Sequence, residues 1–460
     1  MATDTSLDRG TRSTKELGKA AVSGWLGTAM EFMDFQLYSL ATALVFNELF
    51  FPDVHPAIGI IAAMGIYGVG YVARLVGAVY FGRMGDRIGR KRVLFLTIAL
   101  MGVSTTLIGV LPTYAMIGIW APVLLVVLRL AQGFGAGAEI AGATVMLAEY
   151  APPRRRGVIA SLVSLGTNSG TLAASGIWAL LAVVMPREQL LEWGWRLPFL
   201  LSFVLLILAL WIRFSLKESP VFEQRPDVQN GVAVSRTELR AEAESATGAA
   251  QSTIEAALHQ RKGRAFFLAL GLRFGQAGNS GLVQTYILAY IGGIVAAAAA
   301  VGPTAIMIGS IVGFVTVPVV GLLGDRFGRR PIYLIATALT AVLAVPLLIM
   351  VSSGDEVLTI VGIVVALNVG VLSLFSLESV TMAEIFGSRT RFTQLALAKE
   401  VGGILTTAIG PVLAATFTAL TGHWWPLAAM IIGYSAVTFV SAWIMPEVRG
   451  RDLVQLQDAV

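Results

Sequence analysis

Residues 82–92 read GRMGDRIGRKR, and residues 321–330 read GLLGDRFGRR. The two stretches share the spacing G-x-x-x-D-R-x-G-R and begin 239 residues apart. A second pair lies at nearly the same offset, because AEYAPPRRRG at residues 148–157 matches AEIFGSRTR at residues 383–391, 235 residues further on. Two matching pairs at similar offsets predict a chain built from two repeats in the same orientation.

The composition places these repeats in a membrane. Of the 460 residues, 56% are hydrophobic and only 13% are charged, whereas soluble proteins have about 25% charged residues. The apolar segments suffice for about twelve spans of about 20 residues each, so we expect an all-α membrane protein with two six-helix halves. The expected spans are residues 20–46, 57–81, 93–111, 117–148, 158–184, 196–216, 264–291, 300–322, 332–351, 356–384, 393–420 and 424–445.

The placement of lysine and arginine predicts the orientation of the spans. With the N-terminus inside, 27 of the 33 basic residues fall in cytoplasmic segments, and only Arg187 lies clearly in an outer loop. We therefore expect a multi-pass protein of the bacterial cytoplasmic (inner) membrane with both termini in the cytoplasm. The expected units are a cytoplasmic N-terminal segment (1–19), a six-helix bundle (20–216), a polar cytoplasmic linker (217–262), a second six-helix bundle (263–446) and a cytoplasmic tail (447–460).

The sequence argues against several other classes of protein. It contains no cysteine, so disulfide frameworks and thiolate metal or redox chemistry are excluded. It has no P-loop and no H-E-x-x-H motif, and the net charge of +5 resides between apolar segments rather than in a nucleic-acid-binding patch. We expect no enzyme activity, no cofactor, no metal and no nucleic-acid partner. The N-terminus lacks the pattern of a cleaved signal peptide.

The repeated loops predict a charge latch on the cytoplasmic side. Glycines permit a tight turn, an aspartate can cap a neighbouring helix, and arginines can pair with acids at other helix ends. The alternative is that these basic residues only anchor the chain in the positive-inside sense. The candidate latch residues are Gly82, Asp86, Arg87, Arg90, Glu149, Asp325, Arg326, Arg329 and Glu384.

Ionisable residues inside the spans are the candidates for function, because burying charge in a membrane is costly. By the rise of about 1.5 Å per residue, Glu31, Arg74 and Glu139 fall at similar depth and could pair. Asp34 and Arg129 fall nearer the midplane. A second cluster is expected in the second half and contains Arg273, Glu378, Lys399 and Glu400. Lys399 and Glu400 point about 100° apart on a helix, so we expect only one of them to face a cavity.

Two roles are assigned to these charges and to polar residues at comparable depth. A buried carboxylate can carry a coupled proton, and an arginine can bind a carboxylate bidentately. The alternative is that they form static ion pairs or interhelical hydrogen bonds. The proton-coupling candidates are Asp34, Glu31 and Glu139. The substrate-binding candidates are Arg74, Arg129, Tyr38, Asn168, Arg273, Gln276, Asn279, Glu378, Lys399 and Glu400.

The duplicated loop and the 6+6 layout resemble the major facilitator superfamily. Further segments resemble its metabolite:proton symporters, over about residues 24–446. These segments are EFMDF (31–35), ALVFNE (43–48), IGIWAP (117–122), RLAQG (129–133), GAE (137–139) and WGWRLPF (193–199). The first half is most similar to shikimate and dehydroshikimate permeases. The same family includes 2-oxoglutarate, citrate, and proline or betaine permeases. Helix 2 departs from the family pattern, since RLVGA (74–78) stands where Arg-Pro-x-Gly-Gly is usual.

The resemblance implies a proton-coupled symporter that imports a small organic acid, such as shikimate, an aromatic acid or a di- or tricarboxylate. Its partners would be that acid, a proton and the lipid bilayer, and a monomer is expected by analogy with the family. The alternatives are a proline/betaine-type zwitterion symporter, a proton-driven exporter of hydrophobic compounds, and a non-transporting membrane receptor. The tail of 14 residues is too short for the coiled coil that osmosensing relatives carry.

Overall fold

The structure is a computed structural model, and every regular element in the part of the chain that it describes is a helix. It describes residues 14–53, 56–88, 90–137, 139, 143, 147–148, 151, 153–214, 262–387, 391–453, 455 and 457–460. Within that part of the chain there is no strand. The expected linker (217–262) lies almost entirely outside the described residues, and so does most of the expected N-terminal segment.

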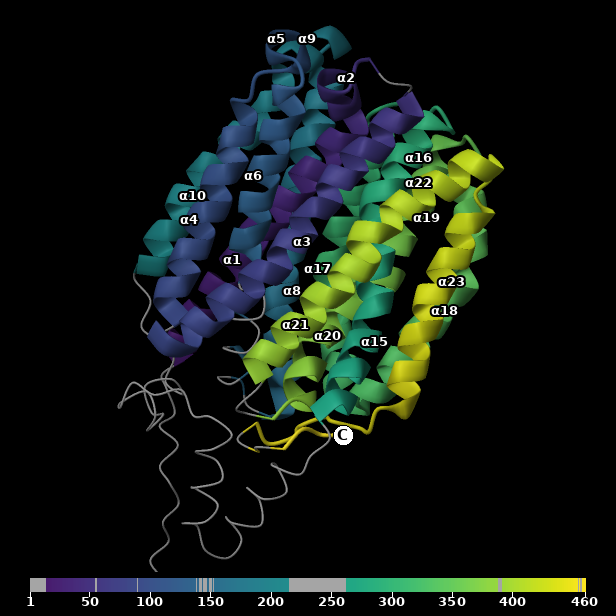
Figure 1. The fold of residues 1–460 in the computed structure, drawn as a ribbon. Coiled ribbons are helices and arrows are strands. Elements are labelled where there is room, and N and C mark those ends of the chain that lie inside the picture. Colours follow the sequence, from purple (N-terminus) through teal and green to yellow (C-terminus); the bar gives the residue numbers. More distant parts are fainter. Residues whose placement is uncertain are drawn as a thin grey trace, which may run out of the picture.

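The helices fall into two groups that stand side by side (Figure 1). The first group consists of α1 (Thr14–Ala41), η1 (Thr42–Phe46), α2 (Asn47–Phe50), α3 (Pro56–Ile88), α4 (Arg90–Gly109), α5 (Tyr114–Ile117), α6 (Trp120–Ala136), η2 (Pro153–Arg155), α8 (Arg156–Val184), α9 (Arg187–Glu192), η3 (Gly194–Arg196) and α10 (Leu197–Phe214). The second consists of α15 (Lys262–Gly281), η4 (Leu282–Tyr286), α16 (Ile287–Gly293), α17 (Val301–Phe327), α18 (Arg329–Val351), α19 (Glu356–Ala366), η5 (Leu367–Leu372), α20 (Ser373–Ile385), α21 (Arg391–Gly403), η6 (Ile404–Ala408), α22 (Ile409–Thr421) and α23 (Trp425–Ile444). We call these groups the N half and the C half.

The spans agree closely with those expected from hydropathy. Among the described residues, nine helices are long and apolar enough to cross a membrane, and α6 is a shorter apolar helix. Helices α1 and α15 complete the set of twelve, and they are less apolar because they carry charged side chains. The predicted all-α fold with twelve membrane-spanning helices is confirmed. In Figure 1 the C-terminal tail lies at one end of the bundle, which we call the tail end.

Glycines allow helices within the N half to approach closely. A Cβ placed on Gly170 of α8 would lie 2.0 Å from the carbonyl oxygen of Ala29 in α1, and one on Gly77 of α3 would lie 2.0 Å from that of Phe134 in α6. No side chain fits at such distances. The helix pairs α1–α8 and α3–α6 therefore pack backbone against backbone.

We expect Gly170→Ala to destabilise the protein by about 1–3 kcal/mol, because the new methyl group must push α8 away from α1. Gly176→Ala in the same helix is the matched control, since its Cβ would meet only the Met307 sulfur at 3.8 Å. Thermal unfolding of the detergent-purified protein measures both variants. Equal melting temperatures would contradict this account of the packing.

The two halves repeat one irregularity of the backbone. Helix α1 passes into a π-helical turn at Thr42–Phe46, and α15 passes into another at Leu282–Tyr286, 240 residues later. This offset matches the sequence repeat. The turns lie close to the contact between the halves, where the Ser39 hydroxyl donates to the Gln284 carbonyl at 3.2 Å and lies 3.1 Å from the Thr285 hydroxyl. π-Helical turns often occur at functional sites.

Candidate functional site

A chain of hydrogen bonds connects three helices in the interior of the N half. Asp34 of α1 accepts a hydrogen bond from the Thr105 hydroxyl of α4 at 2.7 Å. The Gln132 amide of α6 lies 2.6 Å from that hydroxyl and accepts from the guanidinium of Arg129. Asp34 is only 1% exposed, and Arg129 and Gln132 are fully buried. This series of hydrogen bonds joins a buried carboxyl group to a buried guanidinium through two neutral side chains.

Arg129 has few hydrogen-bond acceptors for a buried guanidinium. Its Nε and Nη2 atoms have no hydrogen-bond partner among the described residues. Instead, the rings of Phe35, Tyr38 and Tyr67 surround it, with the guanidinium carbon 4.3, 4.3 and 5.1 Å from their centroids. Cation–π contact offsets part of the cost of burying this charge. The Tyr38 hydroxyl also has no partner in the described part of the chain.

Arg74 of α3 connects the two halves. Its Nη1 donates to Glu31 of α1 at 2.5 Å, within the N half. Its Nε and Nη2 donate to the two carboxylate oxygens of Glu400 in α21, at 2.7 and 2.9 Å. The three side chains are buried, with exposed fractions of at most 6%. The sequence predicted the pairing of Arg74 with Glu31, but it placed Glu400 in a separate cluster.

The remaining charges of that cluster do meet within the C half. Arg273 of α15 donates to Glu378 of α20 at 3.0 Å and also to Gln276. Lys399 of α21 lies 3.2 Å from Glu378 and 5.2 Å from the centroid of Phe375. Of the neighbours Lys399 and Glu400, Lys399 thus stays in its own half and Glu400 reaches across. The wide angle between adjacent helical side chains explains this division.

Three other candidates make separate hydrogen bonds, and one of them, Glu139, also interacts electrostatically with Glu31. Asn168 of α8 donates to the Ser310 carbonyl of α17 at 2.6 Å, which is a contact between the halves. Glu139 accepts a hydrogen bond from Thr97 at 3.4 Å. Asn279 faces a pocket inside the C half.

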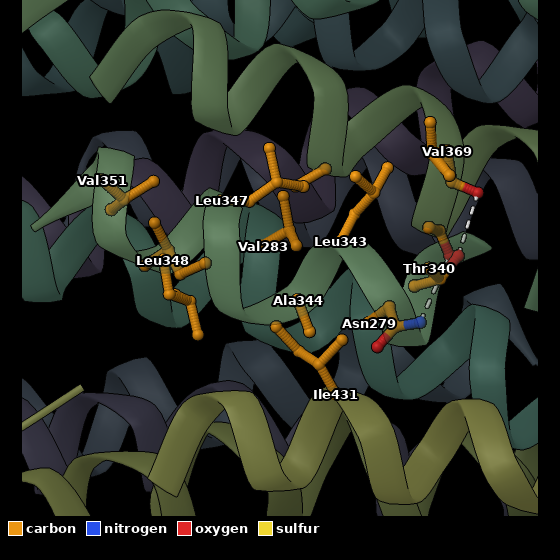
Figure 2. A pocket seen from close by; sticks show the side chains of 13 residues that line it. Asn279, Val283, Thr340, Leu343, Ala344, Leu347, Leu348, Val351, Val369 and Ile431 are labelled. Carbon is orange, nitrogen blue, oxygen red and sulfur yellow. Dashed lines mark hydrogen bonds between the residues drawn. The ribbon is translucent and has the colours of Figure 1, made fainter. Parts of the chain in front are cut away.

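Figure 2 shows this pocket, which is apolar except at one end, where Asn279 and Thr340 lie close together. The Asn279 amide donates weakly to the Gly370 carbonyl at 3.4 Å. The pocket is lined by Asn279, Val283, Ile287, Thr340, Leu343, Ala344, Leu347, Leu348, Val351, Ala366, Val369, Gly370 and Ile431. All of these residues belong to the C half. A pocket within one half does not change its access when two halves move relative to each other, so it does not have the location of an alternating-access site.

The second copy of the repeated loop connects the two halves at the tail end. Asp325, near the end of α17, accepts hydrogen bonds from the backbone amides of Gly157 and Val158 at 2.9 and 3.0 Å, at the start of α8 in the other half. Arg329 pairs with Asp325 at 2.9 Å and with Glu384 at 3.1 Å.

Other candidate latch residues differ in what the structure shows of them. Arg326 lies over the ring of Phe327. Gly82 faces Phe392 of the C half. The side chains of Asp86, Arg87 and Arg90, and the whole of Glu149, lie outside the described residues.

Two charged residues near these contacts were not predicted from the sequence. Arg156 of the N half pairs with Glu384 at 3.2 Å. Glu447, just after α23, accepts from the backbone amides of Arg329 and Arg330 at 2.9 and 3.1 Å and so caps α18. Arg156 is the last of three consecutive arginines in the repeated segment at residues 148–157, and the sequence does not indicate which of the three pairs with an acid of the other half. Glu447 could not be predicted, because the sequence alone does not show that it lies at the N-terminus of α18, where a negative charge is favourable.

Asp325→Asn is expected to weaken the closure of the tail end by about 1 kcal/mol, because it removes the charge that caps α8 across the interface. Asp355→Asn is the matched control, since Asp355 caps α19 within its own half by accepting from the Leu358 amide at 2.8 Å. The chain has no cysteine, so Ser161→Cys, buried beside Gly321, supplies a single reporter thiol. Its rate of alkylation should rise several-fold with Asp325→Asn only. A rise with neither variant would contradict the latch.

Comparison with known proteins identifies the family. The profile of the sugar (and other) transporter family matches residues 42–459. The chain belongs to the major facilitator superfamily. It is 52% identical to the putative transporter YdfJ of Escherichia coli (strain K12) over 93% of this chain and 96% of that protein. It is 33% identical to the shikimate transporter of the same strain, over 96% and 98%. The proline/betaine transporter of that strain is 31% identical, over 95% and 85%.

Solved structures of the superfamily share the fold. The proton:xylose symporter XylE, bound to 6-bromo-6-deoxy-D-glucose, matches with a TM-score of 0.75 at 17% identity, over 96% of this chain and 98% of that one. The chain is therefore a multi-pass major facilitator transporter and not an enzyme. In such a transporter the substrate site lies between the halves, and Arg74, Glu400 and Asp325 all make contacts there.

Proposed function

We propose that this transporter is a proton-coupled symporter that imports a small organic acid by alternating access. The observation that carries the proposal is the buried chain from Asp34 through Thr105 and Gln132 to Arg129. A buried carboxylate beside a buried cation can take up and release a proton as its surroundings change. Burial of both groups at such cost supports a role in transport rather than in stability alone.

A cation at the interface between the halves supports an anionic substrate. There the Arg74 guanidinium already binds one carboxylate, that of Glu400 from the opposite half. Arginine suits a carboxylate because its planar fork binds both oxygens. The same cation disfavours a proton-driven exporter of hydrophobic compounds.

The relatives support this proposal and leave one competitor. A shikimate transporter and proline/betaine transporters are similar to this chain to nearly the same extent. Shikimate is an acid, whereas proline and betaine are zwitterions. A zwitterion would need an unpaired acid as well as a cation in its site. In the described interior, Glu31, Glu378 and Glu400 each pair with a cation. Asp34, which is hydrogen-bonded to Thr105, is assigned to the proton, and this division of roles favours the acid.

We extend the proposal to the arrangement in the membrane. The N half and the C half are the two bodies that rock, the tail end faces the cytoplasm together with both termini, and the protein works as a monomer. The positive-inside distribution of basic residues supports this orientation. In this orientation the structure has its cytoplasmic latch closed. The first copy of the loop, with Asp86, Arg87, Arg90 and Glu149, is proposed to form the matching half of the latch.

The test is uptake into proteoliposomes that contain the purified full chain. Labelled shikimate, 2-oxoglutarate, citrate, protocatechuate, proline and betaine are offered separately, with and without an inward proton gradient. We expect gradient-driven accumulation of an organic acid. Accumulation of betaine or proline alone would replace this proposal with the zwitterion alternative, and empty-liposome levels for every compound would reject both.

A further inference from the structure

Glu400 sits where a substrate carboxylate would bind. The Glu400 oxygens lie 2.7 and 2.9 Å from Nε and Nη2 of Arg74, so the carboxylate lies side-on against the guanidinium. Arginine binds carboxylates in general through this two-point geometry. Glu400 belongs to the opposite half, so it leaves this place whenever the halves separate here.

The Arg74–Glu400 pair can break without leaving an isolated buried charge. Removing one member of a buried ion pair is normally costly because the other is left uncompensated. Here Arg74 keeps Glu31 at 2.5 Å in its own half. Glu400 still interacts electrostatically with Lys399, its neighbour on α21. Each half therefore retains a local counter-charge, which suits a contact that opens and closes.

Aromatic rings lie beside the same guanidinium. The guanidinium carbon of Arg74 is 5.0 Å from the centroid of Phe35 and 5.5 Å from that of Tyr71. The guanidinium is thus bordered by two flat rings as well as by the Glu31 carboxylate. The rings fit a carboxylate attached to a ring or a compact apolar body.

We propose that the substrate is such a carboxylate, that it binds Arg74 in place of Glu400, and that this exchange releases the two halves on the cytoplasmic side. The inference rests on the proposed function, because it requires an acid to enter between the halves. It adds a specific site for the carboxylate and a reason why binding leads to opening. Glu400 acts as an internal competitor that holds the empty transporter closed.

The experiment follows opening through one thiol. The chain has no cysteine, so Ser161→Cys gives a single reaction site at a serine that is buried against Gly321 of the other half. The rate at which a membrane-impermeant maleimide alkylates it is measured on the purified full chain. Shikimate, benzoate and 2-oxoglutarate are the probes, and shikimate methyl ester is the uncharged control.

Two variants each remove one carboxylate from an arginine. Glu400→Gln breaks the contact between the halves and should raise the alkylation rate about tenfold without any ligand. Glu48→Gln breaks only the exposed pair of Glu48 with Arg187 within the N half and should leave the rate unchanged. On the parent protein, at least one of the acids should raise the rate and the methyl ester should not. On Glu400→Gln that acid should add nothing further.

Several results would overturn the exchange. They are equal rates for the two variants, no response of the parent to any of the acids, or a response to the acid that survives in Glu400→Gln. If Glu400→Gln does not yield folded protein, Glu400→Asp shortens the reach by one methylene and should also raise the rate, and an unchanged rate would count against the proposal. Uptake by the same preparation separates the two claims: accumulation with an insensitive thiol rejects only the exchange, whereas absent accumulation rejects the proposed function.

Discussion

Asp34→Asn is expected to abolish proton-driven accumulation of the substrate while leaving exchange of labelled for unlabelled substrate intact. Asparagine keeps an oxygen that can accept from Thr105, which lies 2.7 Å from the native carboxylate, but it can neither take up nor release a proton. Exchange needs no net movement of protons, so it survives. A gradient of one pH unit stores about 1.4 kcal/mol per proton, which corresponds to about tenfold accumulation. This whole factor should disappear.

The control is Asp355→Asn, which alters an aspartate that caps α19 within the C half. It should accumulate substrate as the wild type does. Accumulation at the wild-type level by Asp34→Asn would contradict the assignment, and Glu31 or Glu139 would then be the candidate for proton coupling. Loss of both accumulation and exchange would show that Asp34 serves binding or folding rather than proton coupling.

Arg129→Gln is expected to give the same separation of accumulation from exchange. Arg129 interacts electrostatically with Asp34 and is joined to it through Gln132 and Thr105. An isolated buried carboxylate is far more costly than a neutral one, so Asp34 without this cation stays protonated. A carrier that stays protonated exchanges substrate but does not use the gradient. Accumulation should again fall by about the full tenfold that one pH unit supports.

The double variant tests whether the two residues act as one unit. Residues that act together show strong non-additivity, so Asp34→Asn with Arg129→Gln should be no worse than either single change. Arg187→Gln is the control, because Arg187 pairs with Glu48 in an exposed contact between α2 and α9. Independent, multiplying losses in the double variant would contradict the shared role.

The spans and the repeat could be predicted from the sequence because they depend on local composition. Apolar runs of membrane length and the duplicated loop need no knowledge of neighbouring helices. The same holds for the pairing of Arg74 with Glu31, which followed from similar depth in adjacent spans. The contacts of Asp325 with α8 and of Glu384 with Arg156 could not be predicted in this way, because they depend on how the two halves meet.

Glu400 shows where prediction from the sequence ends. Depth along its helix grouped it with Lys399 and Glu378, yet its rotation about the helix axis directs it to Arg74 in the other half. Asn279 was expected to bind substrate for the same reason of depth, and it lines a pocket within the C half. Thr105 and Gln132 were not predicted, because nothing in the sequence pairs them with Asp34 and Arg129 on other helices or with each other. Hydrogen-bond partners of a buried charge become visible only in three dimensions.

The most direct test of proton-coupled symport measures proton movement itself. Wild-type proteoliposomes in lightly buffered medium receive the acid that they accumulate, and an external electrode follows the pH with no gradient imposed beforehand. The account predicts that the medium becomes more alkaline as substrate enters with protons, and that Asp34→Asn gives no such change although it still exchanges substrate. Entry of substrate into wild-type vesicles without any change of external pH would contradict proton coupling.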